Sequence, residues 1–234
     1  MMKTWKLLLI AVILFSMLGM QGCAKTWFVD FTKVSNINNW LLSSNYEIVP
    51  GIGLVLANSN NVTAPFLLTG DFSITVSFKL ATTSAQRVLG AIWLGSIPNY
   101  PHSQSIISFY YEYGGISNPY FELWTDGPTT DTDIMRTSNV EIPGMVNNAI
   151  NTYTIVKVGS SFEARLNGVL LWSWFNTRYE SDNFYLTLNS SWLTDNQVIY
   201  KSVKIEADSS NMTPAAMSLG AGITSGFGDG NCPI

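Results

Sequence analysis

The chain has 234 residues, including 8 Trp, 10 Tyr and 12 Phe, whereas charged residues make up only 12% of it. The formal net charge is -4 and no run of basic residues is present, which argues against a nucleic-acid ligand, because such binding requires Lys and Arg to neutralise phosphates. The length and apolar content suit one large all-β domain, or two small ones, with a sizeable core.

The N-terminal stretch "MMKTWKLLLIAVILFSMLGMQGC" is typical of a secretory signal peptide. Lys3 and Lys6 precede an apolar run over residues 7–18, which is too short to span a bilayer comfortably. Removal of residues 1–22 would leave 10 basic against 16 acidic residues, a net charge of -6. A neutral, hydroxyl-rich ligand suits this composition better than an anionic one.

The end of this leader, Met20-Gln21-Gly22-Cys23, resembles a bacterial lipobox, in which the cysteine is lipidated and becomes the new N-terminus. We therefore predict a lipoprotein signal peptide over 1–22, lipidation of Cys23 and a short anchor over 23–26. The protein would then be an extracytoplasmic membrane-anchored lipoprotein, in the outer membrane, the periplasm or at the cell surface. Met20 stands where lipoboxes usually have Leu, and cleavage after Ala24 would instead give a secreted protein.

Cysteine and histidine are scarce, since the chain has two Cys and one His. If Cys23 is lipidated, Cys232 is a single thiol near the C-terminus, and otherwise the two could form a disulfide. Neither arrangement of the two cysteines indicates a zinc or redox site, and the single histidine, His102, lies in a Pro-rich loop.

Short segments that alternate apolar and polar residues recur after the leader, separated by Gly, Asn and Pro turns. Helical spacing is confined to the leader and a turn near 144–150. The pattern predicts an all-β antiparallel sandwich over 27–207 and a flexible tail over 208–234. In chain order, the predicted strands cover residues 72–80, 88–95, 105–113, 120–126, 151–158, 162–166, 169–174, 182–190 and 197–207.

Four segments carry a resemblance to a known superfamily. They are "FVDFTKVSNINNW" (28–40), "GDFSITVSFKL" (70–80), "NTYTIVKVGSSFEARLNGVLLW" (151–172) and "YKSVKIEA" (200–207). In this order they resemble the concanavalin A-like jelly roll, which includes laminin-G-type modules, and are similar to the bacterial domain related to 3-keto-disaccharide hydrolases. The resemblance implies an architecture that many different functions share.

Catalytic and metal-binding residues are hard to assign from the sequence. Glucanases of the superfamily use a Glu-x-Asp-x-x-Glu strand, which is missing here, so Glu112 and Glu122 are weak candidates for a catalytic pair on adjacent strands. The loop "DGPTTDTD" places Asp126, Asp131 and Asp133 together, and clustered carboxylates suit Ca²⁺, although the spacing is not that of an EF-hand. The sequence thus gives calcium as a possible cofactor and a glycoside hydrolase as the enzyme class to test.

The hairpin "SSFEARLNGVLLWSW" holds more apolar residues than one buried face needs. A two-residue Asn-Gly turn would pair Leu166 with Val169, and continuing this ladder pairs Ala164 with Leu171 and Glu163 with Trp172. The predicted core face then carries Phe162, Ala164, Leu166, Val169 and Leu171, and the predicted second face carries Glu163, Arg165, Leu170, Trp172 and Trp174. Alternation along the segments 105–113 and 120–126 adds further residues to the predicted second face: Tyr110, Glu112, Tyr120, Glu122 and Trp124.

Aromatic rings beside carboxylates and guanidinium groups are typical of sugar-binding surfaces, because rings cover apolar C–H faces and charged groups bond hydroxyls. The predicted ligand-binding residues are Tyr110, Tyr120, Trp124, Glu163, Arg165, Trp172 and Trp174. We therefore expect a lipid-anchored carbohydrate-binding protein. The alternatives are a glycoside hydrolase that uses Glu112 and Glu122, a cell-envelope module that binds another protein, and a second face that is simply covered core.

Overall fold

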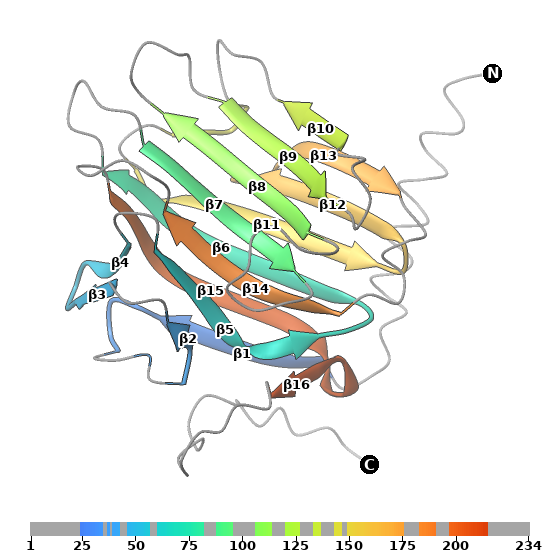
Figure 1. Cartoon of the computed structure of the whole chain (residues 1–234), viewed down its shortest axis with the longest axis horizontal. Helices are drawn as coiled ribbons and strands as arrows, with labels where there is room; N and C mark the ends of the chain where they lie inside the picture. The colour runs from blue at the N-terminus through green and yellow to red at the C-terminus, as the bar shows by residue number, and fades with distance from the viewer. Residues whose placement is uncertain are drawn as a thin grey trace.

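Two antiparallel β-sheets pack face to face in the computed structural model of the chain (Figure 1). Sheet A has the strand order β13-β12-β11-β6-β15-β4-β3, with β1 also paired to β15. Sheet B has the order β10-β9-β8-β7-β14-β5-β16, with β2 also paired to β5. The structure describes residues 24–34, 37, 39–42, 46–56, 60–81, 88–95, 106–113, 120–126, 133–136, 143–146, 149–175, 183–190 and 197–214.

The strands of sheet A come from both halves of the chain. They are β1 (Ala24–Asp30), β3 (Tyr46–Val49), β4 (Gly53–Leu56), β6 (Phe72–Ala81), β11 (Asn151–Val158), β12 (Ser161–Leu166), β13 (Val169–Phe175) and β15 (Gln197–Asp208).

Those of sheet B are β2 (Leu41–Leu42), β5 (Asn61–Leu68), β7 (Val88–Gly95), β8 (Ile106–Tyr113), β9 (Tyr120–Asp126), β10 (Asp133–Arg136), β14 (Phe184–Ser190) and β16 (Met212–Pro214). All nine predicted strands are confirmed, and the β-sandwich fold class with them. The predicted turn near 144–150 is not helical in its described residues, and the described part of the chain has one short 3₁₀ helix, η2 (Ser209–Asn211).

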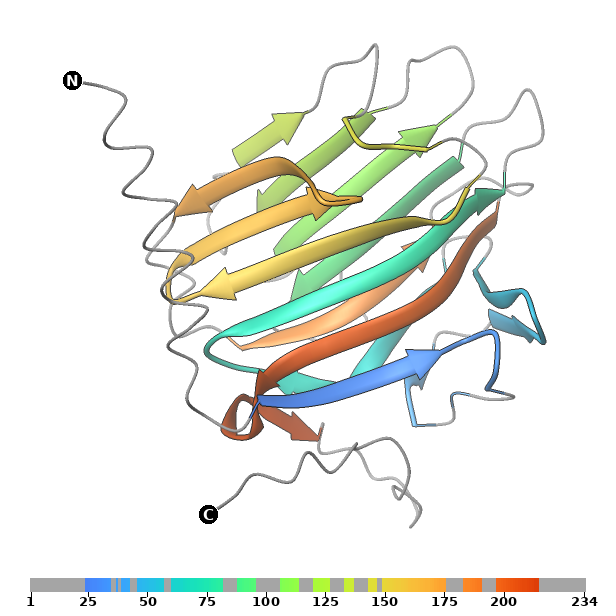
Figure 2. The same ribbon diagram turned by 180° about the vertical axis from the view of Figure 1, so that it is seen from behind.

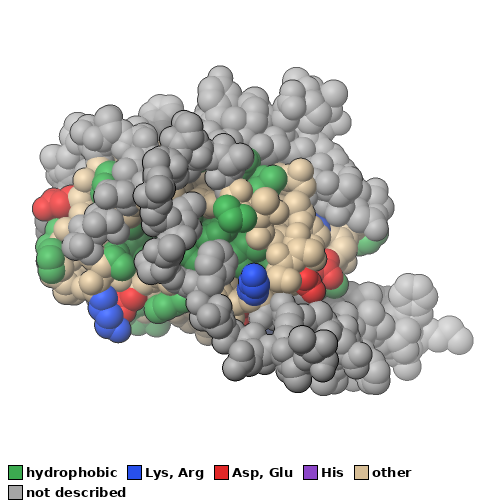
Figure 3. All heavy atoms as spheres, turned by 90° about the horizontal axis from the view of Figure 1, so that it is seen from below, with side chains coloured by type: hydrophobic (Ala, Val, Ile, Leu, Met, Phe, Trp, Pro, Cys, Tyr) green, Lys and Arg blue, Asp and Glu red, His purple; other side chains and the backbone are tan. Residues whose placement is uncertain are grey.

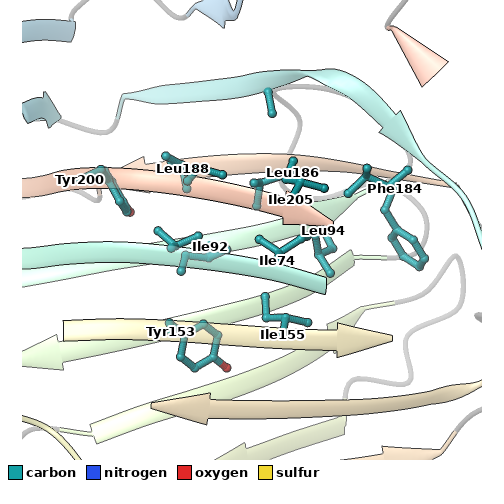
Figure 4. Packing of buried hydrophobic residues seen from close by; sticks show 14 of the residues in the cluster. Ile74, Ile92, Leu94, Tyr153, Ile155, Phe184, Leu186, Leu188, Tyr200 and Ile205 are labelled. Carbon is teal, nitrogen blue, oxygen red and sulfur yellow. The ribbon is translucent and has the colours of Figure 1, made fainter. Parts of the chain in front are cut away.

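The core fills the space between the sheets with alternate residues of each strand. From sheet A come side chains such as Ile74, Ile155 and Ile205, and from sheet B come Ile92 and Leu188, all fully buried (Figure 4). Tyr200 of β15 crosses this interior, and its hydroxyl lies 2.8 Å from the carbonyl of Asn189 and 3.1 Å from that of Ala91. This bond satisfies a buried polar group and ties the two layers together.

An aromatic cluster closes the sandwich beside β1. The rings of Trp27 and Trp40 have centroids 5.6 Å apart, and Phe31 and Phe66 pack edge-on against them at 5.4 and 5.0 Å. Trp27, Phe31 and Trp40 lie in or beside the segment 28–40 that carried the superfamily resemblance. Trp27, Phe31 and Trp40 are therefore part of the core and not of a ligand surface, whereas Phe28 is exposed.

Both ends of the sandwich extend beyond the predicted limits of 27 and 207. Residues 24–26 belong to β1 and are not a linker, because they pair with β15 from Ala24 to Asp208 onward. At the other end β16 pairs with β5, so residues 208–214 are part of the fold and not a tail. Residues 1–23 and 215–234 lie outside the described residues, and with them the predicted signal peptide, Cys23 and Cys232. No helix among the described residues is long and apolar enough to cross a bilayer.

Candidate functional site

The predicted second face is split between the two sheets. Strands β8 and β9 belong to sheet B, whereas β12 and β13 belong to sheet A (Figures 1 and 2). Because the core lies between the sheets, their outer faces point in opposite directions. Tyr110, Tyr120 and Trp124 therefore cannot form one ligand surface with Glu163 and Arg165, and the expectation of a single mixed face is wrong.

Trp172 is a core residue and not part of an outer face. The Asn167-Gly168 turn has positive φ angles of 49° and 83°, and Leu166 pairs with Val169 as predicted. The register then shifts by one residue, so that Trp172 pairs with Ala164 and Glu163 with Ser173. A one-residue bulge reverses the face of everything beyond it, which leaves Trp172 only 7% exposed within the core.

The same bulge changes the other expectations for this hairpin. Trp174 pairs with Phe162, a core residue, instead of standing in the row of Glu163, and its side chain lies outside the described residues. Val169, predicted as core, is 42% exposed at the hairpin tip. Leu171, the residue left unpaired by the register shift, packs partly against the core.

Glu163 and Arg165 do lie on the outer face of sheet A, where they bind each other. Arg165 Nη2 lies 2.7 Å from Glu163 Oε1, and its Nε lies 3.3 Å from Oε2. The guanidinium also donates to the carbonyl of Gly168 at 3.2 Å. Their polar groups are thus occupied within the hairpin, which weakens the case for them as ligand contacts.

On sheet B, the outer face carries a different set of residues, which the sequence reasoning missed. In β7 and β14 the side chains that lie in the core are Ile92, Leu94, Leu186 and Leu188. The residues that alternate with them along the two strands therefore face away from the core. Those residues are Ala91, Trp93, Tyr185, Thr187 and Asn189, and Thr63 and Asn61 continue their rows in β5. Polar residues at alternate positions of "NFYLTLNS", beside the Trp of "VLGAIWLG", were the available signal.

Most of these residues are buried although they lie outside the core, and Tyr185 and Asn61 are partly exposed. Trp93 is 7% exposed, Thr187 and Asn189 are each 4% exposed, and Thr63 is fully buried. The hydroxyls of Thr63 and Thr187 are 2.7 Å apart, a hydrogen bond across the strands. The prediction that strand 88–95 is covered on both sides is therefore confirmed for its described side chains, 91–95.

Among the described side chains of this face, two polar atoms have no hydrogen-bond partner. They are the indole Nε1 of Trp93, a donor, and the amide Oδ1 of Asn189, an acceptor, both out of contact with solvent. The amide nitrogen of Asn189 is bonded, to Asn61 Oδ1 and to the carbonyl of Asn60. Buried unpaired groups of this kind each cost about 1–3 kcal/mol, so native proteins rarely keep them without a reason.

The backbone register extends these rows into β8, β9 and β10. The row of Trp93 continues through Ser108, Trp124 and Ile134, and the row of Ala91 and Asn189 continues through Tyr110, Glu122 and Arg136. Glu112 pairs with Tyr120, which puts Glu112 and Glu122 on a diagonal, about 7–8 Å apart between Cα atoms. The side chains of β8, β9 and β10 lie outside the described residues, so the roles predicted for Tyr110, Tyr120 and Trp124 stay predictions.

The predicted calcium residues fall in the connection between β9 and β10. Asp126 ends β9, Asp133 begins β10, and Asp131 lies outside the described residues, as does His102. Among the side chains that the structure does describe, no group of three or more His, Cys, Asp or Glu could hold a metal ion. Because the side chains of this connection are not among them, calcium stays a prediction.

Two ionisable residues lie in the core-facing row of β11. Burial raises the pKa of Tyr153 well above its ordinary value of 10.0, because the charged form loses its hydration. Lys157 is fully buried, donates to the carbonyl of Gly70 at 2.8 Å, and lies 6.0 Å from the ring centroids of Phe72 and Phe162. Both side chains face the interior and lie away from either outer face.

Comparison with solved structures identifies the architecture. SCLam, a non-specific endo-β-1,3(4)-glucanase from family GH16, matches with a TM-score of 0.60 at 12% identity, over 79% of this chain and 91% of that one. The endo-β-1,3-glucanase from Pyrococcus furiosus matches with a TM-score of 0.59 at 11% identity, over 77% of this chain and 93% of that one. The chain therefore shares the β-sandwich fold of these two glucanases.

Binding modules also have this jelly roll. The CBM2 module of the evolved Dit protein of Lactobacillus casei BL23 phage J-1 matches with a TM-score of 0.57 at 10% identity, over 78% of this chain and 96% of that one. A scan against protein-family models and a search of curated proteins find no match. At these identities the similarity establishes the jelly roll and leaves its function to be argued from the site.

Proposed function

We propose that the protein is an extracytoplasmic, lipid-anchored jelly roll that binds a carbohydrate through the outer face of sheet B. The observation that carries this proposal is the pair of unpartnered buried atoms on that face, Trp93 Nε1 and Asn189 Oδ1. The lipobox-like sequence ending at Cys23 supports the anchor. Glucanases and carbohydrate-binding modules among the similar structures support the ligand class.

A sugar hydroxyl both donates and accepts hydrogen bonds, so neighbouring hydroxyls of one ring can accept from Trp93 and donate to Asn189. Trp93 pairs with Thr187, and Asn189 follows two residues later, so the two side chains are diagonal neighbours on one face. The register also brings Tyr110, Tyr120 and Trp124 to this sheet, with ring systems suited to the apolar face of a sugar. Both unpaired atoms are closed to solvent, so binding requires this face to open. Because neither atom forms a hydrogen bond in the closed state, opening breaks none at these atoms, which lowers its free-energy cost.

Retention of residues 24–234 on a glycan array, followed by titration of Trp93→Phe against the best glycan, tests the proposal. The variant keeps a ring and loses the indole N–H, so we expect affinity to fall about tenfold, the equivalent of one hydrogen bond. The free energy of unfolding should change by less than about 1 kcal/mol, because an unpaired donor is removed along with some packing. Leu170→Ala, on the other sheet, is the control and should bind as the wild type does. Absence of retention on every glycan, or unchanged affinity in Trp93→Phe, would contradict the proposal.

A glycoside hydrolase is the second candidate, favoured by the diagonal placement of Glu112 and Glu122 on paired strands. Two carboxylates on one face could serve as general acid and as nucleophile or base. Hydrolysis of a glycan retained on the array, abolished by Glu122→Gln while binding persists, would establish this activity. Equal rates for Glu122→Gln and the wild type would remove Glu122 from the mechanism.

A further inference from the structure

The first strand of the sandwich begins directly after the cysteine of the lipobox-like sequence. Ala24 pairs with Asp208, and the antiparallel ladder continues without interruption to Asp30 and Ser202. Cys23 is the residue before Ala24, so a lipid attached there has no linker between it and the fold. The tether is one residue long, which leaves the domain little freedom to rotate over a bilayer.

Ala24 lies at one end of the sandwich, together with the ends of several other strands. Val158 pairs with Ser161, and Ser161 pairs with Phe175, so the last residues of β11 and β13 share this end with the start of β1 (Figure 2). We call it the Ala24 end, comprising Ala24, Lys25, residues 69–71, 158–161, Phe175, Asn183 and residues 208–211. In Figure 2 it lies on the left, where β1 (blue) begins and β11 and β13 (yellow to orange) end.

The described surface of the Ala24 end suits a lipid headgroup layer. Phe175 is 70% exposed, the largest exposure among the exposed large hydrophobic side chains of the described residues. The other exposed side chains of this end are uncharged or basic: Lys25, Ser161, Asn183, Ser209 and Ser210. An aromatic ring of this kind inserts readily at the membrane interface.

Two carboxylates lie at this end, and both accept hydrogen bonds from neighbouring residues. Asp208 accepts hydrogen bonds from the backbone N–H of Ser210 at 3.0 Å and from its hydroxyl at 2.8 Å, which hold the pKa of Asp208 below its ordinary value. Asp71 accepts from the N–H of Gly159 at 2.7 Å. Because neutral donors leave the carboxylate of Asp208 charged, the attraction of this end to a bilayer rests on the acyl anchor and Phe175 and not on charge.

We infer that the Ala24 end docks on the membrane surface and that the strands stand upright on it. This inference rests on the lipid anchor in the proposed function and adds the orientation. Strand β15, with 12 residues at about 3.4 Å each, would carry the opposite end about 40 Å from the bilayer. The outer face of sheet B then runs parallel to the membrane normal.

Fluorophores placed at the two ends of the lipidated full-length protein test the orientation. In a Cys232→Ser background, Ser209→Cys and Phe175→Cys report on the Ala24 end, and Val146→Cys, 53% exposed near the start of β11, reports on the other end. The protein is reconstituted into phosphatidylethanolamine–phosphatidylglycerol vesicles that contain brominated lipid. We expect at least threefold stronger quenching at 209 and 175 than at 146. Equal quenching at both ends, or stronger quenching at 146, would overturn the inference.

Two further variants test the contribution of the lipid anchor and of its short tether. Cys23→Ser should abolish the difference in quenching, and a ten-residue Gly-Ser insertion between Cys23 and Ala24 should reduce it at least twofold. Unchanged quenching with the insertion would show that the short tether does not orient the domain. Mass spectrometry of the membrane-extracted protein reports acylation. An unacylated protein would overturn both the anchor and the orientation. An acylated protein with equal quenching at both ends would overturn the orientation alone. Retention on a glycan array tests carbohydrate binding independently of both.

Discussion

The two outer faces of this jelly roll differ although both are built from alternate residues of antiparallel strands. Along β11 of sheet A burial alternates strictly, with every second residue half-exposed. Along β14 of sheet B six of the seven residues are buried, on both faces. The three described ion pairs, Asp30–Lys33, Glu163–Arg165 and Lys204–Glu206, all belong to strands or turns of sheet A. One outer face is a solvated surface, and the other is a second, partly polar interior, where hydrogen bonds to a ligand would be strongest.

The edge of the sandwich differs from the buried face of sheet B. Figure 3, viewed from the edge with β1, β2 and β16, shows hydrophobic side chains with acidic and basic side chains beside them among the coloured residues. This edge is therefore a mixed surface.

The largest expected effect comes from placing the same charge on each face. Thr187→Lys on sheet B would bury an ammonium and should cost at least about 3 kcal/mol in the free energy of unfolding. Thr154→Lys on the half-exposed face of sheet A should stay within about 0.5 kcal/mol. Urea denaturation of both variants measures the difference. A cost below about 1 kcal/mol for Thr187→Lys would show that the face of sheet B is open to water.

Trp172 and Leu170 test the two sides of the β13 hairpin. Trp172→Ala should lower the free energy of unfolding by about 3–5 kcal/mol, because it leaves a cavity in the core. Leu170 is 47% exposed on the same strand, and Leu170→Ala should cost less than about 1 kcal/mol. Thermal melts of the pair check the register shift. Similar small losses in both variants would mean that Trp172 lies on an outer face after all.

A smaller effect is expected for acid stability, through Asp30 at the end of β1. Hydrogen bonds from the Thr32 side chain and from Lys33 hold the pKa of Asp30 below its ordinary value of 3.8. A lowered folded-state pKa stabilises the fold above the unfolded pKa, and this stabilisation is lost as pH falls through the folded value. The destabilisation by Asp30→Asn should therefore be largest near pH 6 and shrink below about pH 4. Urea midpoints measured across this range test it, and a difference that grows toward acid pH would contradict the assignment.

The smallest effect is expected at Arg165. The arginine side chain is 40% exposed, and exposed ion pairs contribute about 0.2–1 kcal/mol, so Arg165→Ala should cost no more than that. Added salt should narrow the gap to the wild type in chemical denaturation. Glycan affinity should be unchanged, because Arg165 lies on the outer face of sheet A. A loss of affinity in this variant would move the binding face to the other sheet.

Much of the fold followed from residue patterns. Alternation with Gly and Asn-Gly turns predicted nine strands and the sandwich, because a half-buried strand must alternate to keep one face dry. Seven strands were not among them: β1, β2, β3, β4, β5, β10 and β16. Five of these are only two to four residues long, and β5 has Pro65 within it. Short or Pro-containing strands give too little alternation to be recognised.

The candidate site was less predictable, for two physical reasons. An alternating pattern says which residues share a face of one strand, but not which strands share a sheet, so β8 and β9 were combined wrongly with β12 and β13. A one-residue bulge also leaves no mark in the composition, yet it moved Trp172 from the outer face to the core. In both cases the sequence indicated the chemical character of the residues, and the error concerned where those residues lie in the fold.

The sequence by itself determined the β-sandwich, the polar and aromatic character of its strands and the expectation of a secreted, lipid-anchored chain, because these depend on local periodicity and local motifs. Only the tertiary structure decided which face is buried, that Trp93 and Asn189 carry unpaired atoms on it, and that β1 begins directly after Cys23. Strand order and register arise from contacts between segments far apart in the chain, such as β1 with β15 and β5 with β14. No local pattern specifies those contacts.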